Sequence, residues 1–286
     1  MTKNNLHFAN NLTVLTQCRC KSKGNIYKMT ILSSDYFPQK TIKRFKLLPS
    51  TNDFASEWCQ SLLLPPEGSI VITENQAQGK GQTGNSWQSE VGKNLTFSMI
   101  YYPTFLPIDQ IFALNMITSL AVWSSLGHLS LVNLSIKWPN DILINQRKVA
   151  GILIRNSLAG KKVASSVIGI GLNVNQLVFP QGIPNATSLQ LATQQIVDKE
   201  DIFHRIIHHF ESYYIALKNG HYGPIKQQYL AQLYRKGQEF TFFRKDNSSF
   251  QGKILDVRDT GHLLVEVKGE IEAFDFQEIR FRPISA

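Results

Sequence analysis

The 286-residue sequence contains only three cysteines, Cys18, Cys20 and Cys59. Three thiols cannot form a disulfide framework, and their spacing is not that of a zinc site, so we expect all three to be reduced. No apolar run approaches the roughly 20 residues needed to cross a bilayer, and the start lacks the compact apolar stretch and cleavage site of a secretory signal. These absences predict a cytoplasmic protein without a membrane partner.

The first 46 residues have almost no acidic side chains. They hold nine lysines or arginines against Asp35 alone, whereas the rest of the chain carries 21 basic and 20 acidic residues, so the net charge of +9 arises at the front. Such a leader could be an organelle-targeting segment, a nucleic-acid-binding arm or residues upstream of the natural start. Met29 opens the first convincing pattern, and we therefore predict that residues 1–28 are a disordered tail or a mis-called start.

The near-neutral body argues against an extended phosphate-binding face. Residues 1–40 are also too short for a helix-turn-helix and lack two amphipathic helices. We therefore expect no DNA binding.

Apolar periodicity predicts an α+β fold with a mixed β-sheet. A capping-box-like start at Ser50 opens a helix whose expected apolar face is Phe54, Trp58, Leu62 and Leu63, before Pro65-Pro66 ends it. Further helices are expected at 108–126 and, as a pair, over 200–233. The expected strands are 41–48, 69–73, 95–102, 134–138, 141–145, 149–156 and 163–174, then 238–243, 250–257, 262–267 and 270–274. The last four indicate a small barrel-like module at residues 236–286 after a main domain at residues 29–235.

A glycine-rich loop at residues 79–84 satisfies the pattern G-x-G-x-x-G. In a dinucleotide-binding fold a helix would follow directly, but here the chain leads toward a strand. The glycines still let backbone N–H groups approach an anion, and Lys80 adds a mobile positive charge. The alternative is a flexible surface loop.

Residues 137–141, Lys-Trp-Pro-Asn-Asp, place an ammonium, an indole, an amide and a carboxylate at one rigid turn after an apolar strand. Lys148 follows at the edge of the next hairpin. The alternative is a core tryptophan and a turn proline beside a surface Lys–Asp pair. A third segment, residues 169–175, ends a strand with glycines that permit close approach of a flat ligand, although an edge strand with bulges would look alike.

These segments, together with Ser50-Thr51-Asn52, occur in the order seen in biotin-protein ligases, and the chain resembles that family from about residue 40 to its end. The resemblance implies a class II synthetase-like catalytic domain and a C-terminal SH3-like domain. It also implies an ATP-dependent ligase that forms biotinoyl-5'-AMP with ATP and Mg²⁺. The biotin then passes to a lysine of a carrier domain, expected to be that of acetyl-CoA carboxylase or a related carboxylase.

The resemblance also implies roles for individual residues. Four look catalytic, namely Lys148, Lys80, Lys137 and Asp141. Those that look like biotin-binding residues are Ser50, Thr51, Asn52, Gln76, Lys80, Gly81, Gln82 and Lys148. Those that look like ATP- or adenylate-binding residues are Lys80, Trp87, Asn140 and Asn173. No metal ligand is identified, and Asp141 is open between acting on a proton, holding magnesium and pairing with Lys137.

The sequence departs from many bacterial members in the glycine-rich loop, where Lys80, Gln82 and Asn85 replace arginines. A lipoate-protein ligase is the nearest rival, but its arginine-rich and triple-glycine signatures are absent. A nucleic-acid-binding protein and a binding-only module are further alternatives. His204, His208 and His209 have helical spacing without an evident third metal ligand, so a solvated helix face is favoured. A monomer and a homodimer both remain open.

Overall fold

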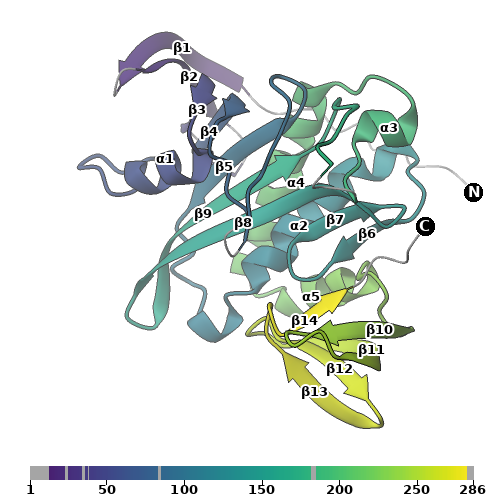
Figure 1. Cartoon of the computed structure of the whole chain (residues 1–286). Coiled ribbons are helices and arrows are strands. Elements are labelled where there is room, and N and C mark those ends of the chain that lie inside the picture. Colours follow the sequence, from purple (N-terminus) through teal and green to yellow (C-terminus); the bar gives the residue numbers. More distant parts are fainter. Residues whose placement is uncertain are drawn as a thin grey trace, which may run out of the picture.

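A nine-stranded mixed sheet is the framework of the protein (Figure 1). The computed structural model describes residues 13–22, 25–33, 36–37, 39–82, 85–181 and 185–281. The strand order is β1-β2-β3-β4-β5-β9-β8-β7-β6, in which only β3 and β4 pair in parallel. The bounds are β1 Thr13–Ser22, β2 Asn25–Ser33, β3 Lys40–Leu48, β4 Ile70–Gln76, β5 Leu95–Tyr101, β6 Leu134–Lys137, β7 Asp141–Ile144, β8 Arg147–Ala159 and β9 Lys162–Leu172.

Three helices form a layer on one face of this sheet. They are α2 (Ala113–Leu126, preceded by the short 3-10 turn Ile108–Gln110), α4 (Lys199–Lys218) and α5 (Tyr222–Ala231). The helix α2 packs against the sheet; α2 and α4 lie behind the sheet in the view of Figure 1, and α5 packs on both of them. Alternate residues of β5 enter the core beneath them, and Phe97 meets the ring of Phe203 at 5.2 Å. Ile100 of the same strand belongs instead to a smaller apolar cluster, which lies on the opposite face of the sheet beneath α1 (Thr51–Trp58). The period of two therefore gives the sheet two separately covered faces.

The expectation that no apolar run approaches the roughly 20 residues needed to cross a bilayer is wrong for the segment Ile108–Leu129. It is long and apolar enough to cross a membrane by length and composition. In the folded protein 67% of its most apolar window is buried, and α2 within it packs on α4, α5 and the sheet. This burial is that of a core helix.

Residues 1–28 were predicted to be a disordered tail or a mis-called start, and where the structure describes them they form strands instead of a disordered tail. β1 and β2 form an antiparallel hairpin, and β2 continues the sheet at the outer edge of β3. The inner face of β2 is apolar, since Tyr27 packs against Phe45 with ring centroids 4.9 Å apart. Met29 lies inside β2 rather than opening the fold. Residues 1–12 and 23–24 lie outside the described residues.

The first helix starts as predicted but ends early. The Ser50 hydroxyl caps α1 by accepting a hydrogen bond from the Asp53 N–H, at 3.2 Å. The helix stops at Trp58, and the expected face does not extend to Leu62 and Leu63, which are exposed. Proline disfavours helical backbone in the residue before it, and the leucines have no facing surface to cover. The short helix α3 (Leu189–Thr193) was not predicted.

The chain ends in a second, five-stranded antiparallel sheet, ordered β13-β12-β11-β10-β14 (yellow-green to yellow in Figure 1). Its strands are β10 Glu239–Arg244, β11 Ser249–Val257, β12 Leu263–Val267, β13 Glu270–Phe274 and β14 Ile279–Phe281. The predicted C-terminal β module and α+β class are thus confirmed, with β14 as an additional strand. The Trp138 indole N–H donates to the Gly261 carbonyl across the junction, at 2.8 Å, so the two sheets share one buried contact surface.

Two ion pairs join β3 to α4 in opposite environments. Lys40 and Glu211 pair at 2.5 Å with side chains 0% and 3% exposed, whereas Arg44 and Glu200 pair at the surface. Removing one partner of a buried pair leaves an uncompensated charge. We expect Lys40→Met to cost about 3–5 kcal/mol of unfolding free energy, and Arg44→Met less than about 1 kcal/mol. Urea unfolding measures both, and equal losses would contradict this account.

Candidate active site

A cavity opens on the face of the sheet that carries α1, where the N-terminus of that helix, the glycine-rich loop and the strands β5, β8 and β9 meet. Residues predicted from widely separated segments come together here. The predicted residues that line it are Ser50, Thr51, Asn52, Gln76, Lys80, Gly81, Gln82, Trp87, Asn140, Asp141 and Lys148.

Polar groups at the start of α1 are held in fixed directions. The Gln76 side-chain oxygen accepts from the Thr51 N–H at 2.9 Å. The Ser98 hydroxyl lies 2.8 Å from the Thr51 hydroxyl and 2.6 Å from the Asn52 side-chain oxygen, and Asn52 donates to the Leu153 carbonyl. Because each group is held by another element, the cavity presents a preformed set of donors and acceptors.

Two glycines of β9 make room for this arrangement. A Cβ at Gly169 would collide with the Asn52 amide, and one at Gly171 with the Trp87 indole. Trp87 therefore lies flat on β9, with its indole N–H buried and without a hydrogen-bond partner among the described residues. An unpaired buried donor at a cavity wall is a group that a ligand can satisfy.

Lys148 and Asp141 form an ion pair at the cavity wall, with Nζ to Oδ1 at 2.6 Å. Strand register places Asp141 opposite Gly151 and Lys148 opposite Leu143, so the hairpin of β7 and β8 supplies both groups. The ammonium lies 5.9 Å from the centroid of the Trp87 ring. The site thus combines a positive charge, an orienting carboxylate and a flat aromatic surface.

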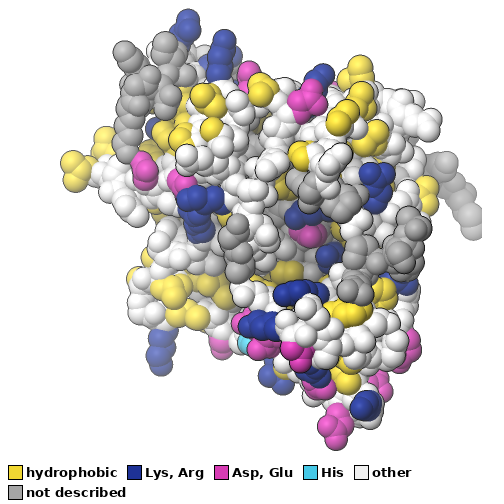
Figure 2. Space-filling view, viewed as in Figure 1, with side chains coloured by type: hydrophobic (Ala, Val, Ile, Leu, Met, Phe, Trp, Pro, Cys, Tyr) yellow, Lys and Arg dark blue, Asp and Glu magenta, His cyan; other side chains and the backbone are white. Residues whose placement is uncertain are grey.

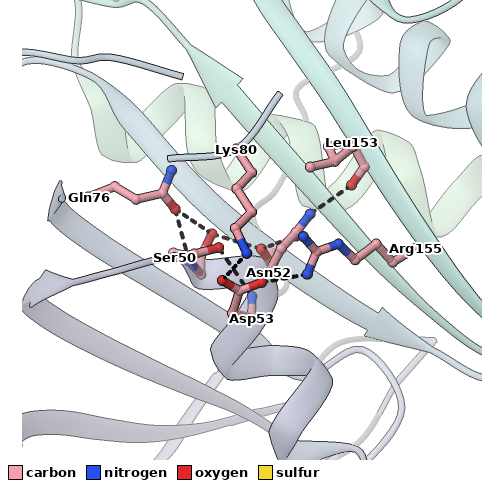
Figure 3. A network of polar contacts seen from close by, with 9 residues as sticks. Ser50, Asn52, Asp53, Gln76, Lys80, Leu153 and Arg155 are labelled. Atoms are coloured by element: carbon pink, nitrogen blue, oxygen red, sulfur yellow. Dashed lines mark hydrogen bonds and ion pairs between the residues drawn. The ribbon is translucent and has the colours of Figure 1, made fainter. Parts of the chain in front are cut away.

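Lys80 is held by a second ion-pair network at the other end of the cavity (Figure 3). Its ammonium lies 2.8 Å from one carboxylate oxygen of Asp53, and the Arg155 guanidinium lies 2.5 Å from the other. Burial raises the pKa of Asp53, but hydrogen bonds from Lys80 and Arg155 outweigh it, and the pKa falls below its ordinary value of 3.8. The carboxylate is therefore charged near neutral pH.

Two predicted residues do not line the cavity. The Lys137 ammonium lies over the Phe281 ring, 5.2 Å from its centroid, near the C-terminal sheet. Burial lowers the pKa of Lys137; nearby Asp141 opposes that shift and Lys148 adds to it. Asn173 is buried behind the wall and donates to the Thr187 carbonyl at 3.0 Å, while its side-chain oxygen has no partner in the described part of the chain. The alternative in which Lys137 and Asp141 form a surface ion pair is wrong, because Asp141 pairs with Lys148.

Sequence reasoning missed several contributors. Asp53 and Arg155 are 102 positions apart and meet only in the fold, and Ser98 sits in a strand that reads as plain β-structure. The sequence indicated that Asp53 lies at the start of a helix, but it did not indicate which residues pair with it. Thr83 and Gly84 of the glycine-rich loop lie outside the described residues.

The chain resembles proteins that act on biotin. A family profile described as "Biotin/lipoate A/B protein ligase family" matches residues 45–173. The bifunctional ligase/repressor BirA of Bacillus spizizenii is 33% identical over 210 residues, covering 72% of this chain and 64% of the relative. The biotin–[acetyl-CoA-carboxylase] ligase of Paracoccus denitrificans is 30% identical over 203 residues, covering 68% of this chain and 82% of the relative.

A solved structure shares the fold. The biotin protein ligase of Aquifex aeolicus in complex with biotin and ATP superposes with a TM-score of 0.70 at 24% identity, covering 84% of this chain and 98% of that one. Fold and site thus define a ligase-type α+β protein with a preformed polar cavity. The chain belongs to the biotin/lipoate A/B protein ligase family. It spans 64% of the length of the Bacillus relative.

The glycine of β9 beneath Trp87 offers a direct test of the cavity floor. Gly171→Ala puts a methyl group into the indole, so we expect Trp87 to lift off and stability to fall by about 1–3 kcal/mol. Acrylamide quenching of tryptophan fluorescence and urea unfolding report the two effects. Gly127→Ala is the control, because its Cβ would meet open space at a helical φ of −60°. Equal behaviour of the two variants would contradict the packing.

Proposed function

We propose that the protein is an ATP-dependent biotin-protein ligase that forms biotinoyl-5'-AMP and transfers biotin to a lysine of a carboxylase carrier domain. The observation that carries this is one cavity in which the capped start of α1, the glycine-rich loop and the Lys148–Asp141 pair face one another. These are the segments on which the family resemblance rests. The relatives named as biotin–[acetyl-CoA-carboxylase] ligases support the same activity.

The first step joins the carboxylate of biotin to the α-phosphorus of ATP. A carboxylate oxygen attacks, the bond to the bridging oxygen breaks, and pyrophosphate leaves with the electron pair. Negative charge gathers on carboxyl and phosphate oxygens, and Lys148 and Lys80 lie at the cavity wall, where they stabilise it. The polar groups of Thr51, Gln76 and Asn52 suit the ureido ring, which has both donors and acceptors.

The second step passes the acyl group to the carrier lysine. The neutral amine attacks the acyl carbon, and AMP leaves with the electrons of the anhydride bond. In this proposal Asp141 accepts the proton released by the amine, and its carboxylate lies 2.6 Å from the Lys148 ammonium. The glycine-rich loop covers the mixed anhydride and excludes water between the two steps.

Magnesium would be brought by ATP. Among the described residues no group of three or more His, Cys, Asp or Glu side chains could hold a metal ion, and Asp141 is the only carboxylate among those that line the cavity. Mg²⁺ is commonly held by one or two carboxylates together with substrate phosphates, so Asp141 fits that role. Bound there, the ion would neutralise phosphate charge.

The partner we propose is the biotin carrier domain of acetyl-CoA carboxylase or a related enzyme, in the cytoplasm where ATP and carboxylase are found. On the face seen in Figure 2, Lys and Arg side chains are scattered rather than joined in one field. This distribution supports a protein carrier over nucleic acid as the partner. Whether the ligase acts as a monomer or a homodimer does not alter the chemistry of the site.

ATP–pyrophosphate exchange with purified protein tests the activity, because it reports the first step without a carrier. We expect exchange with added biotin and none without an acid. Exchange with lipoate alone would assign the protein to the other branch of its family. If neither acid supported exchange, the protein would be a binding protein rather than a ligase.

Lys137 and Lys148 lie at different positions relative to the cavity, so substitutions at the two should differ in their effect on activity. Lys148→Ala removes a charge from the cavity wall, so we expect biotin-dependent exchange to fall about a hundredfold or more. Lys137→Ala changes a side chain that lies over Phe281, and its loss should be much smaller. Near-normal exchange by the Lys148 variant would contradict the assignment. Urea midpoints of both variants check that each is folded.

A further inference from the structure

Asp53, a carboxylate outside the cavity lining, forms an ion pair with Lys80 of the glycine-rich loop. Asp53 sits in the first turn of α1, where the N-cap Ser50 and the positive end of the helix favour a negative charge. It accepts Lys80 on one oxygen and Arg155 on the other. Figure 3 shows Lys80 descending from the loop and Arg155 approaching from β8 to meet at this carboxylate. Three elements converge on one side chain.

Backbone hydrogen bonds fix the base of the loop, because the Ala77 and Gln78 N–H groups donate to the Leu48 and Pro49 carbonyls just before α1, but in the described part of the chain none of them joins residues 79–82 to the helix. Lys80 pairs with Ser86, and the Gly81 N–H donates to the Asn85 carbonyl at 2.7 Å, so these bonds close the loop on itself. The contact from the loop tip to α1 is the ion pair of Lys80 with Asp53. Asp53 in turn is tied by Arg155 to β8, which lies between β7 and β9 in the sheet.

The network is too exposed to contribute much to the stability of the fold. The three side chains are 33–49% exposed, and partly exposed ion pairs add little to folding stability. Their charges sum to +1, since two cations share one carboxylate. A monoanionic carboxylate brought near Lys80 would complete the balance, and the ammonium has two N–H donors beyond the one directed at Asp53 to offer it.

We propose that Asp53, anchored by Arg155, is a positioning residue that latches Lys80 and thereby holds the glycine-rich loop over the reacting acid. The role of the loop in keeping an adenylate rests on the proposed function; the latch itself does not. Neither Asp53 nor Arg155 touches the reacting atoms. Asp53 and Arg155 act on the reaction only by holding Lys80 in place.

Trypsin reads the latch without any ligand, because it cleaves after Lys80. In Asp53→Asn the side chain keeps its shape and loses its charge, and we expect cleavage after Lys80, followed by mass spectrometry, to quicken about threefold to fivefold, the size of a partly exposed ion pair. Arg155→Met should quicken it less. Glu57→Gln is the matched control, since it removes an exposed acid one turn further along α1 and should leave cleavage unchanged.

Salt distinguishes a latch from a loosened helix. At about 1 M salt the screening length is about 3 Å, so wild type should approach the Asp53→Asn variant in its rate of cleavage after Lys80. A difference that persists in high salt would overturn the proposal in favour of a structural role. Cleavage of the Asp53→Asn variant at the wild-type rate would also overturn it.

Release of free biotinoyl-AMP tests the consequence for the reaction. Asp53→Asn should release more adenylate per pyrophosphate formed, and adding Lys80→Gln should raise release no further, because both changes open one latch. Additive effects would overturn the link through Lys80. A wild-type protein that fails to exchange pyrophosphate with biotin would refute the proposed function, while the trypsin result would still decide the latch.

Discussion

The close approach of α1 and Trp87 to β9 is the constraint on which the rest of the site depends. It exists because Gly169 and Gly171 have no side chains, so that an amide and an indole occupy the space that two Cβ atoms would take. With those surfaces in contact, the capped start of α1 faces the hairpin of β7 and β8 across a narrow gap. A sheet of full-sized residues there would push the helix outward and separate the polar groups that now share one cavity.

Charge is arranged around that gap in paired form. Lys148 meets Asp141 and Lys80 meets Asp53, so each cation at the cavity is already oriented by an acid from another strand or helix. Such pairing lowers the cost of holding like charges together before an anion arrives. It also fixes direction, which a free lysine with four rotatable bonds would lose. The site is preorganised by its counter-charges as much as by its hydrogen bonds.

Local patterns in the sequence predicted most of this fold. Contacts between residues far apart in the sequence could not be predicted from it. The Ser50 cap, the strands around the glycine-rich loop and the Lys148 hairpin follow from neighbours within a few residues. The β1–β2 hairpin was missed because its basic residues hide an alternation whose apolar half packs on Phe45. The family resemblance implied a catalytic role for Lys137, but its ammonium lies over Phe281, 144 positions away in sequence. The partners of Asp53 depend on contacts of the same kind.

The hydrogen bond from the Trp138 indole to the Gly261 carbonyl constrains which C-terminal modules can be joined to this main domain. Gly261 has a φ of +101° and lies against Phe112, so this turn tolerates almost no other residue. The C-terminal sheet and the turn that precedes Asp141 are therefore joined through one backbone carbonyl. A chimera that joined this main domain to the C-terminal module of a relative would have to reproduce the position of that carbonyl to keep the hydrogen bond.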